Sequence, residues 1–350
     1  MFPFRLFAAT GKVVARLDSL DGVSVQTTIV LGSEHQSREG DIVDGVMCIA
    51  VDPHDPERVF VGTFDRGIYR TRDGGEVWES MGSGMADARV LSIAISPCDR
   101  VNGRSVVYAG TEPSMVYRSE DDGETWQASP ALTELPSAPT WSFPPRPDTH
   151  HVRWIALHPT DPAILYAGIE LGGVMVTRDG GAAWEDRKPG SQHDAHAIAT
   201  HPAAPDRVYE AAGGGVAVST DAGATWRPAD EGMDRHYAWG LAVDAVDPDL
   251  WYVSASHGAR TAHRNDGDAQ AILYRKRGNA PWEPLGGDDS GLERPLPYMP
   301  YALLAPRGRP NALIAGLQNG DLLLTEDAGE TWRTLFTGLD SLLALSESER

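Results

Sequence analysis

The 350-residue chain has two cysteines, three lysines and no long hydrophobic run. Two cysteines cannot build the disulfide framework of a small secreted domain. Because Cys48 and Cys98 fall near opposite ends of their predicted strands, we expect two free thiols. No stretch approaches the roughly 18 apolar residues of a membrane-spanning helix, so we expect no integral membrane protein. The first residues lack the pattern of an export signal, and we expect a cytoplasmic protein.

Positive charge is scarce, because the net charge is −20 at pH 7. Nucleic-acid binding needs a basic patch that neutralises phosphates, so this balance argues against a nucleic-acid partner. It also disfavours anionic membrane surfaces. With 41% hydrophobic and 23% charged residues, the composition is otherwise that of a globular protein long enough to bury a large core.

One motif recurs along the chain: Ser or Thr, then Asp, Gly and Trp at positions three, five and eight. It reads TRDGGEVW at 71–78 and returns in four more clear copies. A sixth copy, YRKRGNAPW, keeps Trp282 but has Arg277 in place of the aspartate. The aspartates of the five clear copies are Asp73, Asp121, Asp179, Asp221 and Asp327.

Each copy follows two short apolar segments that are bounded by Gly, Pro and Asp, with no helical periodicity. Four strands in each repeat of about 50 residues are typical of a propeller blade. Residues 1–32 supply three further strands and residues 338–350 one, in a segment centred on 341–345. We therefore predict an all-β, seven-bladed propeller that forms a single domain over 1–350, with both termini in one blade. Six blades is the lesser alternative.

These motifs resemble the Asp-box (BNR) propeller superfamily, over nearly the whole chain. That group includes sialidases, xyloglucanases, sortilin-like receptors and photosystem II assembly-factor-like proteins. The resemblance implies that each box aspartate accepts backbone N–H groups of its own tight turn, which is a structural role. It says little about function, because a fold does not fix chemistry.

A propeller binds ligands at one mouth of its channel, which is lined by the segments that lead into each first strand. We aligned these segments on reference residues Ile49, Ile93, Ile155, Ile198, Leu241, Ala302 and Leu343. Five places earlier, three consecutive blades carry His150, His193 and His236. Three imidazoles are a suitable ligand set for one divalent metal ion. The residues do not distinguish zinc, iron, copper and manganese. Glu112, Glu170 and Asp194 would orient the ring N–H groups. The alternative is a polar lining without metal.

Further polar and aromatic residues are expected at the same mouth. His196, Tyr237 and His257 are candidates for acid–base catalysis. The residues expected to contact substrate are Arg89, Trp141, Trp239, Tyr298 and Tyr301, although the aromatic ones would also suit packing between blades. Two long loops, residues 131–151 and 255–270, would rise on this face.

The enzymes of the superfamily fit the residues poorly. We find no arginine triad of a sialidase, and one propeller lacks the cleft between the two propellers of a xyloglucanase. We therefore favour a metal-dependent hydrolase or lyase acting on a small or carbohydrate-like substrate. The alternatives are a non-catalytic module that binds a protein partner, like the assembly factors, and a glycoside hydrolase without metal.

Overall fold

The computed structural model describes residues 3–32, 37–38 and 43–348. Nearly all of its elements are β-strands, and no helix in this part of the chain is long and apolar enough to cross a membrane. The chain divides into two compact units: Met1–Arg187 with Leu343–Arg350, and Lys188–Leu342. The single domain over 1–350 stays a prediction.

The described residues of the first unit form four antiparallel sheets. Three have four strands, and in the fourth an isolated bridge between Val176 and Glu185 replaces the last strand. In sheet order the strands are β27 (Ala344–Ser348), β1 (Phe4–Ala9), β2 (Val14–Ser19) and β3 (Gln26–Leu31); β4 (Val46–Asp52), β5 (Asp55–Thr63), β6 (Ile68–Thr71) and β7 (Trp78–Ser80); β8 (Arg89–Val101), β9 (Arg104–Glu112), β10 (Val116–Ser119) and β11 (Gln127–Ala128); and β12 (Val152–Leu157), β13 (Leu165–Ile169) and β14 (Gly173–Thr177).

The second unit, as far as it is described, adds three four-stranded antiparallel sheets. Their strands are β15 (Ala195–His201), β16 (Ala204–Ala212), β17 (Gly215–Ser219) and β18 (Arg227–Pro228); β19 (Tyr237–Val243), β20 (Leu250–Ser256), β21 (Ile272–Arg277) and β22 (Glu283–Pro284); and β23 (Pro300–Leu304), β24 (Leu313–Leu317), β25 (Leu322–Thr325) and β26 (Arg333–Phe336). The short helices lie in the two predicted long loops: η1 (Pro130–Glu134), η2 (Ala138–Thr140) and α1 (Ala259–Ala262).

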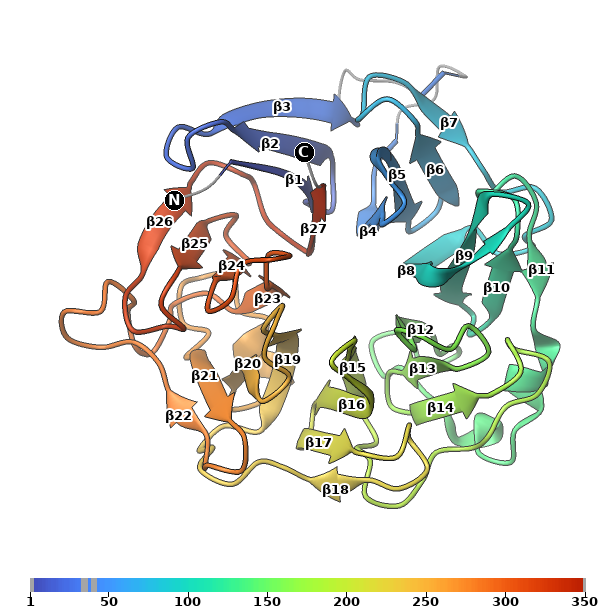
Figure 1. The fold of residues 1–350 in the computed structure, drawn as a ribbon. Helices are drawn as coiled ribbons and strands as arrows, with labels where there is room; N and C mark the ends of the chain where they lie inside the picture. The colour runs from blue at the N-terminus through green and yellow to red at the C-terminus, as the bar shows by residue number, and fades with distance from the viewer. Residues whose placement is uncertain (1–2, 33–36, 39–42, 349–350) are drawn as a thin grey trace. The chain divides into compact units, whose positions relative to one another are not determined.

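The seven sheets of the described residues are the blades of a seven-bladed β-propeller, which confirms the predicted fold class (Figure 1). The blade shared by both termini is also confirmed, because β27 pairs with β1. The last strand, however, is Ala344–Ser348 rather than a segment centred on 341–345. Leu342 is fully buried in the segment between β26 and β27, and the strand begins two residues later.

The register of the first strands follows from their pairing with the second strands. Five reference residues occupy the same register position in their blades. Each pairs with the residue that directly follows a Phe or Tyr in the second strand. These references are Ile49, Ile93, Ile155, Ile198 and Leu241. The other two references were wrong. Leu303, not Ala302, lies opposite Ala315, and Leu345, not Leu343, lies opposite Ala8. β27 begins later than expected, at Ala344; β23 carries the same irregularity as the other bulged first strands, and its equivalent residue is simply one place later.

The box aspartates hold tight turns. Asp179 accepts the Ala183 amide at 2.9 Å and the Thr177 hydroxyl at 2.8 Å, and Thr177 in turn accepts the Gly181 amide. The Ala183 amide and then the Thr177 hydroxyl lower the pKa of Asp179 below its usual range. The other four box aspartates make the same bonds at equivalent positions. These carboxylates are occupied by their own turns.

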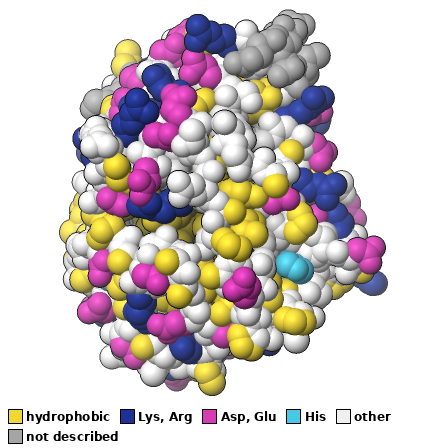
Figure 2. Space-filling view, turned by 90° about the vertical axis from the view of Figure 1, so that its right-hand side faces the viewer, with side chains coloured by type: hydrophobic (Ala, Val, Ile, Leu, Met, Phe, Trp, Pro, Cys, Tyr) yellow, Lys and Arg dark blue, Asp and Glu magenta, His cyan; other side chains and the backbone are white. Residues whose placement is uncertain are grey.

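On the face that Figure 2 shows, acidic and basic side chains gather beside one another, and hydrophobic side chains group near the centre. Cys48 is buried, Cys98 is exposed, and both are free thiols, as predicted. Burial raises the pKa of the Cys48 thiol to about 12.

Candidate functional site

The first strand of six blades carries an irregularity close to its start. In each, one residue or two interrupt the pairing with the second strand: Met47, Leu91, Arg153, His196, Trp239 with Gly240, and Tyr301. A bulge leaves its extra residue outside the ladder and re-aims the side chain, and bulges are frequent beside active sites. The residue at the bulge therefore occupies an equivalent place in these six blades. It is a better guide to a common site than the position five residues before the reference.

Five rings of the second unit lie together in what we call the aromatic cluster: His196, Tyr237, Trp239, His263 and Tyr301. Trp239 is at its centre, with ring centroids 4.5 Å from His196, 4.6 Å from His263 and 5.5 Å from Tyr301. Bulges on β15, β19 and β23 supply three of the rings, and the residue after α1 supplies His263.

A hydrogen-bonded chain runs through this cluster. The Tyr237 hydroxyl lies 2.9 Å from His263 Nε2, and His263 Nδ1 lies 2.7 Å from the Tyr301 hydroxyl. A neutral imidazole carries one N–H, so one phenol donates to the ring and the other accepts from it. The chain can therefore pass a proton between the two phenols through one imidazole.

His196 is buried beneath Trp239 and has one nitrogen in use. Its Nδ1 lies 2.6 Å from the Ala238 carbonyl, which can only accept, so Nδ1 carries the proton. Its Nε2 makes no hydrogen bond among the described residues and lies 3.4 Å from an Asp194 oxygen. That nitrogen is the lone-pair side of the ring and is buried beside the carboxylate.

A second group of residues, in the first unit, is charged rather than aromatic; we call it the Glu112 network. The buried Glu112 carboxylate accepts Nε of Arg146 at 2.7 Å and Nη1 of Arg89 at 3.2 Å. Arg146 also reaches the other oxygen. Burial acts to raise the pKa of Glu112, but Arg146, His151 and Arg89 outweigh it and hold the pKa below its usual range.

His151 joins this network to the next blade. Its Nε2 lies 2.9 Å from Glu170 and its Nδ1 lies 3.5 Å from Glu112. The bulged Arg153 lies 3.8 Å from the same Glu170 oxygen. Glu112, Glu170 and Arg89, selected from the sequence, are thus brought together here, around an imidazole that the sequence placed beside His150 but did not select.

The predicted metal ligands all lie in loops before β12, β15 and β19. His150, in the first unit, has its ring edge against Trp141, with centroids 5.4 Å apart; burial and then His151 lower its pKa. In the second unit, His193 is exposed, and the half-exposed His236 lies 3.8 Å from Asp230. Within either unit, the described residues hold no group of three His, Cys, Asp or Glu whose ligand atoms all lie within 4.8 Å. The metal site stays a prediction.

Three other residues that were expected at the mouth of the channel are Trp141, His257 and Tyr298. Trp141 is only 5% exposed and donates Nε1 to Ser137 Oγ, so its ring is part of the core and is not a stacking face for a ligand. His257 is exposed and has no hydrogen bond among the described residues, whereas His263 of the same loop contacts Tyr237. Tyr298 is partly buried against the core of the second unit.

Glu210 is a buried acid that the sequence interpretation missed. It lies in β16 at the register position where other second strands have Val61, Ala109, Ala167, Val253 and Ala315. One oxygen accepts the Gln192 amide at 3.0 Å and the other has no partner in the described structure. Burial raises the pKa of Glu210 to about 8. A charged residue in the middle of an apolar strand was the available signal.

No family model matches the chain, and no curated protein matches it. Solved structures do. A GH74 xyloglucanase from Xanthomonas campestris is 16% identical with a TM-score of 0.62, and an ancestral GH74 enzyme is 16% identical with a TM-score of 0.60. YCF48 bound to a D1 peptide is 17% identical with a TM-score of 0.55. The fold is shared.

The extent of each match differs. The chain aligns over 100%, 87% and 83% of its own length with these three structures, in the same order. It covers 55% of the xyloglucanase and 38% of the ancestral enzyme, but 82% of YCF48. At these identities the likeness shows the propeller fold, and function has to be argued from the residues of the site.

Proposed function

We propose that the protein binds a carbohydrate-like ligand on the aromatic cluster of the second unit. The observation that carries the proposal is the pair Trp239 and Tyr301. Both side chains are partly exposed, and their rings lie 5.5 Å apart with planes 38° from parallel. Aromatic faces with hydrogen-bonding groups at their edges suit ring-shaped polar ligands. The groups at these edges are the exposed His263 and the Tyr301 hydroxyl.

The fold comparison supports this ligand class, since two similar structures are a GH74 enzyme and a GH74 xyloglucanase. The chain spans only about two fifths and just over half of those two proteins. The substrate of the larger proteins therefore indicates a class of ligand to test, and the binding residues are those of this chain.

Binding is tested by calorimetric titration with xyloglucan and cello-oligosaccharides. We expect Trp239→Ala to weaken binding at least tenfold, because the ring face is lost, and Tyr301→Phe to weaken it less, because only the hydroxyl is lost. Trp154→Ala is the matched control, since Trp154 is an exposed tryptophan of the first unit. Equal losses in Trp239→Ala and Trp154→Ala, or no binding by the wild type, would contradict the proposal.

Acid–base catalysis on the bound ligand, without a metal, is a second candidate function. It is favoured by the Tyr237–His263–Tyr301 chain and by the unused Nε2 of His196. Reducing-end release from the same oligosaccharides measures it. His263→Gln should abolish the activity and leave the dissociation constant within a few-fold. A wild type that binds but releases no reducing ends is a binding protein only.

A module that binds a protein partner is the remaining alternative, and the similarity to YCF48 bound to a D1 peptide favours it. The exposed parts of Arg89 and Arg146 offer a basic surface, but Glu112 already accepts from both side chains. Because Glu112 neutralises these two arginines, the Glu112 network is a weak site for an acidic peptide. We therefore favour a sugar on the aromatic cluster.

The three-histidine site for zinc, iron, copper or manganese stays a separate proposal. It is tested by plasma mass spectrometry on untagged protein, comparing the wild type with a His150→Ala, His193→Ala, His236→Ala variant. Near-stoichiometric metal that is lost in the folded variant would support it. No metal in either protein after loading with all four ions would overturn it.

We also propose that the chain is a member of the Asp-box propeller superfamily. Five turns with the same Ser or Thr, Asp and Gly hydrogen bonds support this assignment. In the eroded sixth copy, Lys276 lies next to the aspartate position and donates to the Ala280 carbonyl at 2.6 Å.

A further inference from the structure

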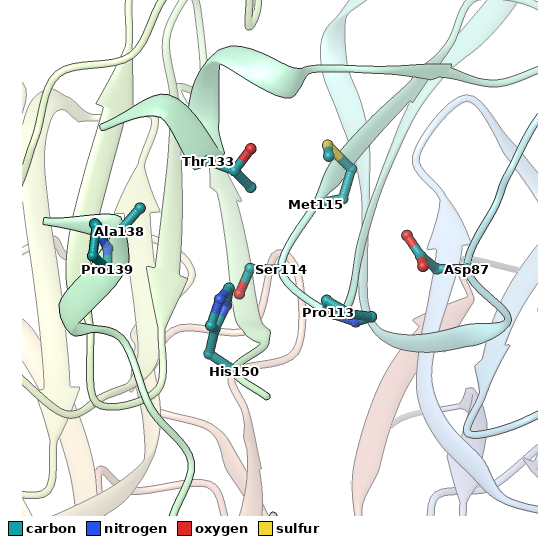
Figure 3. Close-up of a pocket in the computed structure, with 8 residues that line it drawn as sticks. All are labelled: Asp87, Pro113, Ser114, Met115, Thr133, Ala138, Pro139 and His150. Carbon is teal, nitrogen blue, oxygen red and sulfur yellow. The ribbon is translucent and has the colours of Figure 1, made fainter. Parts of the chain in front are cut away.

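A cavity of about 440 Å³ opens in the first unit and takes no residue from the aromatic cluster. It lies between the loop from β9 to β10, the segment before β8, and the inserted segment with η1 and η2. Its size falls in the range of sites for small organic ligands. The residues that line it are Asp87, Pro113, Ser114, Met115, Thr133, Ala138, Pro139 and His150 (Figure 3).

Two buried polar atoms of this lining lack a partner among the described residues: Ser114 Oγ and His150 Nδ1. A buried hydroxyl or ring nitrogen without a hydrogen bond costs free energy, and such groups in folded proteins are normally satisfied. Ser114 is only 2% exposed, and the His150 ring is held by its edge contact with Trp141. A ligand hydroxyl or amide group would supply the kind of partner that these atoms lack.

Most of the remaining lining is apolar, apart from Thr133 and one charged residue. Pro113, Met115 and the η2 residues supply carbon atoms, whereas Asp87 supplies a carboxylate. One Asp87 oxygen accepts the Tyr117 hydroxyl at 3.0 Å, which holds the side chain in place. Figure 3 shows Asp87 and His150 on opposite sides of Pro113, so the charge and the two unpartnered atoms are at separate places in the lining.

We propose that this cavity binds a small organic ammonium ion with an apolar body and a hydroxyl or amide group at its other end. The ammonium group pairs with Asp87, the body contacts Pro113 and Met115, and the polar end bonds to Ser114 and His150. An anionic ligand is excluded by the Asp87 carboxylate, and a wholly apolar one leaves the buried polar atoms unpaired.

The test is calorimetric titration in 150 mM salt with four probes: 6-amino-1-hexanol, hexylammonium, 1-hexanol and hexanoate. We expect 6-amino-1-hexanol to bind tightest, hexylammonium next, 1-hexanol at least tenfold more weakly, and hexanoate not at all. Asp87→Asn should weaken both amines tenfold or more and leave 1-hexanol unchanged. Ser114→Ala should weaken 6-amino-1-hexanol several-fold and leave hexylammonium unchanged.

Asp148→Asn is the matched control, because Asp148 is an exposed acid of the same inserted segment outside the lining. If it weakens the amines as much as Asp87→Asn does, the attraction is only that of an acidic surface and the proposal fails. It also fails if the wild type binds none of the probes at millimolar concentration, or binds hexanoate as well as hexylammonium. Should Asp87→Asn not fold, Ala138→Phe replaces it, since filling the cavity must abolish binding of every probe.

Discussion

Each unit buries one glutamate in a second strand, and the two carboxyl groups behave in opposite ways. Glu112, at the end of β9, contacts Arg146, Arg89 and His151. Glu210, inside β16, accepts one backbone amide and has no ion pair among the described residues. The pKa of Glu112 is lowered, whereas the pKa of Glu210 is raised to about 8.

This difference shows that burial alone does not decide the charge of an acid. Both side chains are essentially inaccessible to water. Desolvation favours the neutral form of each, and only Glu112 has cations near enough to reverse that preference. The first unit therefore holds a fixed negative charge inside an ionic network, whereas the second holds a neutral acid below pH 8.

Of the variants considered, Glu210→Gln should have the largest effect, which is a change in how the free energy of unfolding depends on pH. Between about pH 4.5 and 8 the native Glu210 keeps a proton that the unfolded chain releases, so this contribution to stability falls as pH rises and is lost near pH 8. The wild type should lose about 1.4 kcal/mol for each pH unit relative to the variant. Urea unfolding at pH 5, 7 and 9 measures this, with the exposed Glu293→Gln as control. Parallel curves for wild type and Glu210→Gln would contradict the raised pKa.

Arg146→Ala should destabilise the native state by about 2 kcal/mol at pH 7. The variant removes the two-point partner of Glu112, whose side chain stays buried and charged. We expect less than for a fully buried pair because Arg89 and His151 remain. Urea unfolding measures the loss. A double variant with Glu112→Gln should be more stable than Arg146→Ala alone, and the reverse order would rule out an unpaired charge as the cause.

Glu112→Gln should cost about 1 kcal/mol at pH 7 and change the acid side of the stability profile. The folded pKa is depressed, so its stabilisation is present above the unfolded pKa near 4.5 and is lost as pH falls through the folded pKa. The wild type should therefore lose stability below pH 4.5 more steeply than Glu112→Gln. Thermal unfolding between pH 3 and 6 checks this, and identical slopes would speak against the network.

Arg89→Ala should have the smallest effect, about 0.5 kcal/mol or less at pH 7. Its side chain is 41% exposed, and it makes a single longer contact with Glu112. Both Arg89→Ala and Arg146→Ala remove one arginine from the Glu112 carboxylate, so they remove the same charge. A difference between their losses of stability therefore reports the contact geometry of each arginine. Equal losses in urea unfolding would mean that the two-point geometry of Arg146 adds nothing.

The repeated motif predicted six antiparallel blades, and the strands expected at the two termini predicted a seventh blade that they share. A Ser or Thr, an Asp and a Gly at fixed spacing form a local turn wherever they occur, so neighbouring residues suffice to interpret them. The same analysis selected Glu112, Glu170, Tyr237 and Trp239, which do fall in the two groups of the candidate site.

The alignment by counting residues held for five reference residues and failed for those of β23 and β27. One extra residue reverses which side chains face which side, and nothing local in the sequence distinguishes a bulge from regular pairing. His196 and Tyr301, both selected from the sequence, lie at such bulges, whereas the position five residues before the reference holds loop histidines. Trp141 shows the same limit, because only packing distinguishes a core tryptophan from a stacking face.

The sequence by itself determined the blades and their turns and favoured seven blades over six, because these depend on local hydrogen bonds and a repeated apolar pattern. Only the tertiary structure decided which side chains meet: His263 between two tyrosines, and Arg146 against Glu112. It also decided the charge of each buried glutamate. These outcomes depend on contacts between residues distant in the chain, where desolvation and ion pairing compete over a few ångströms.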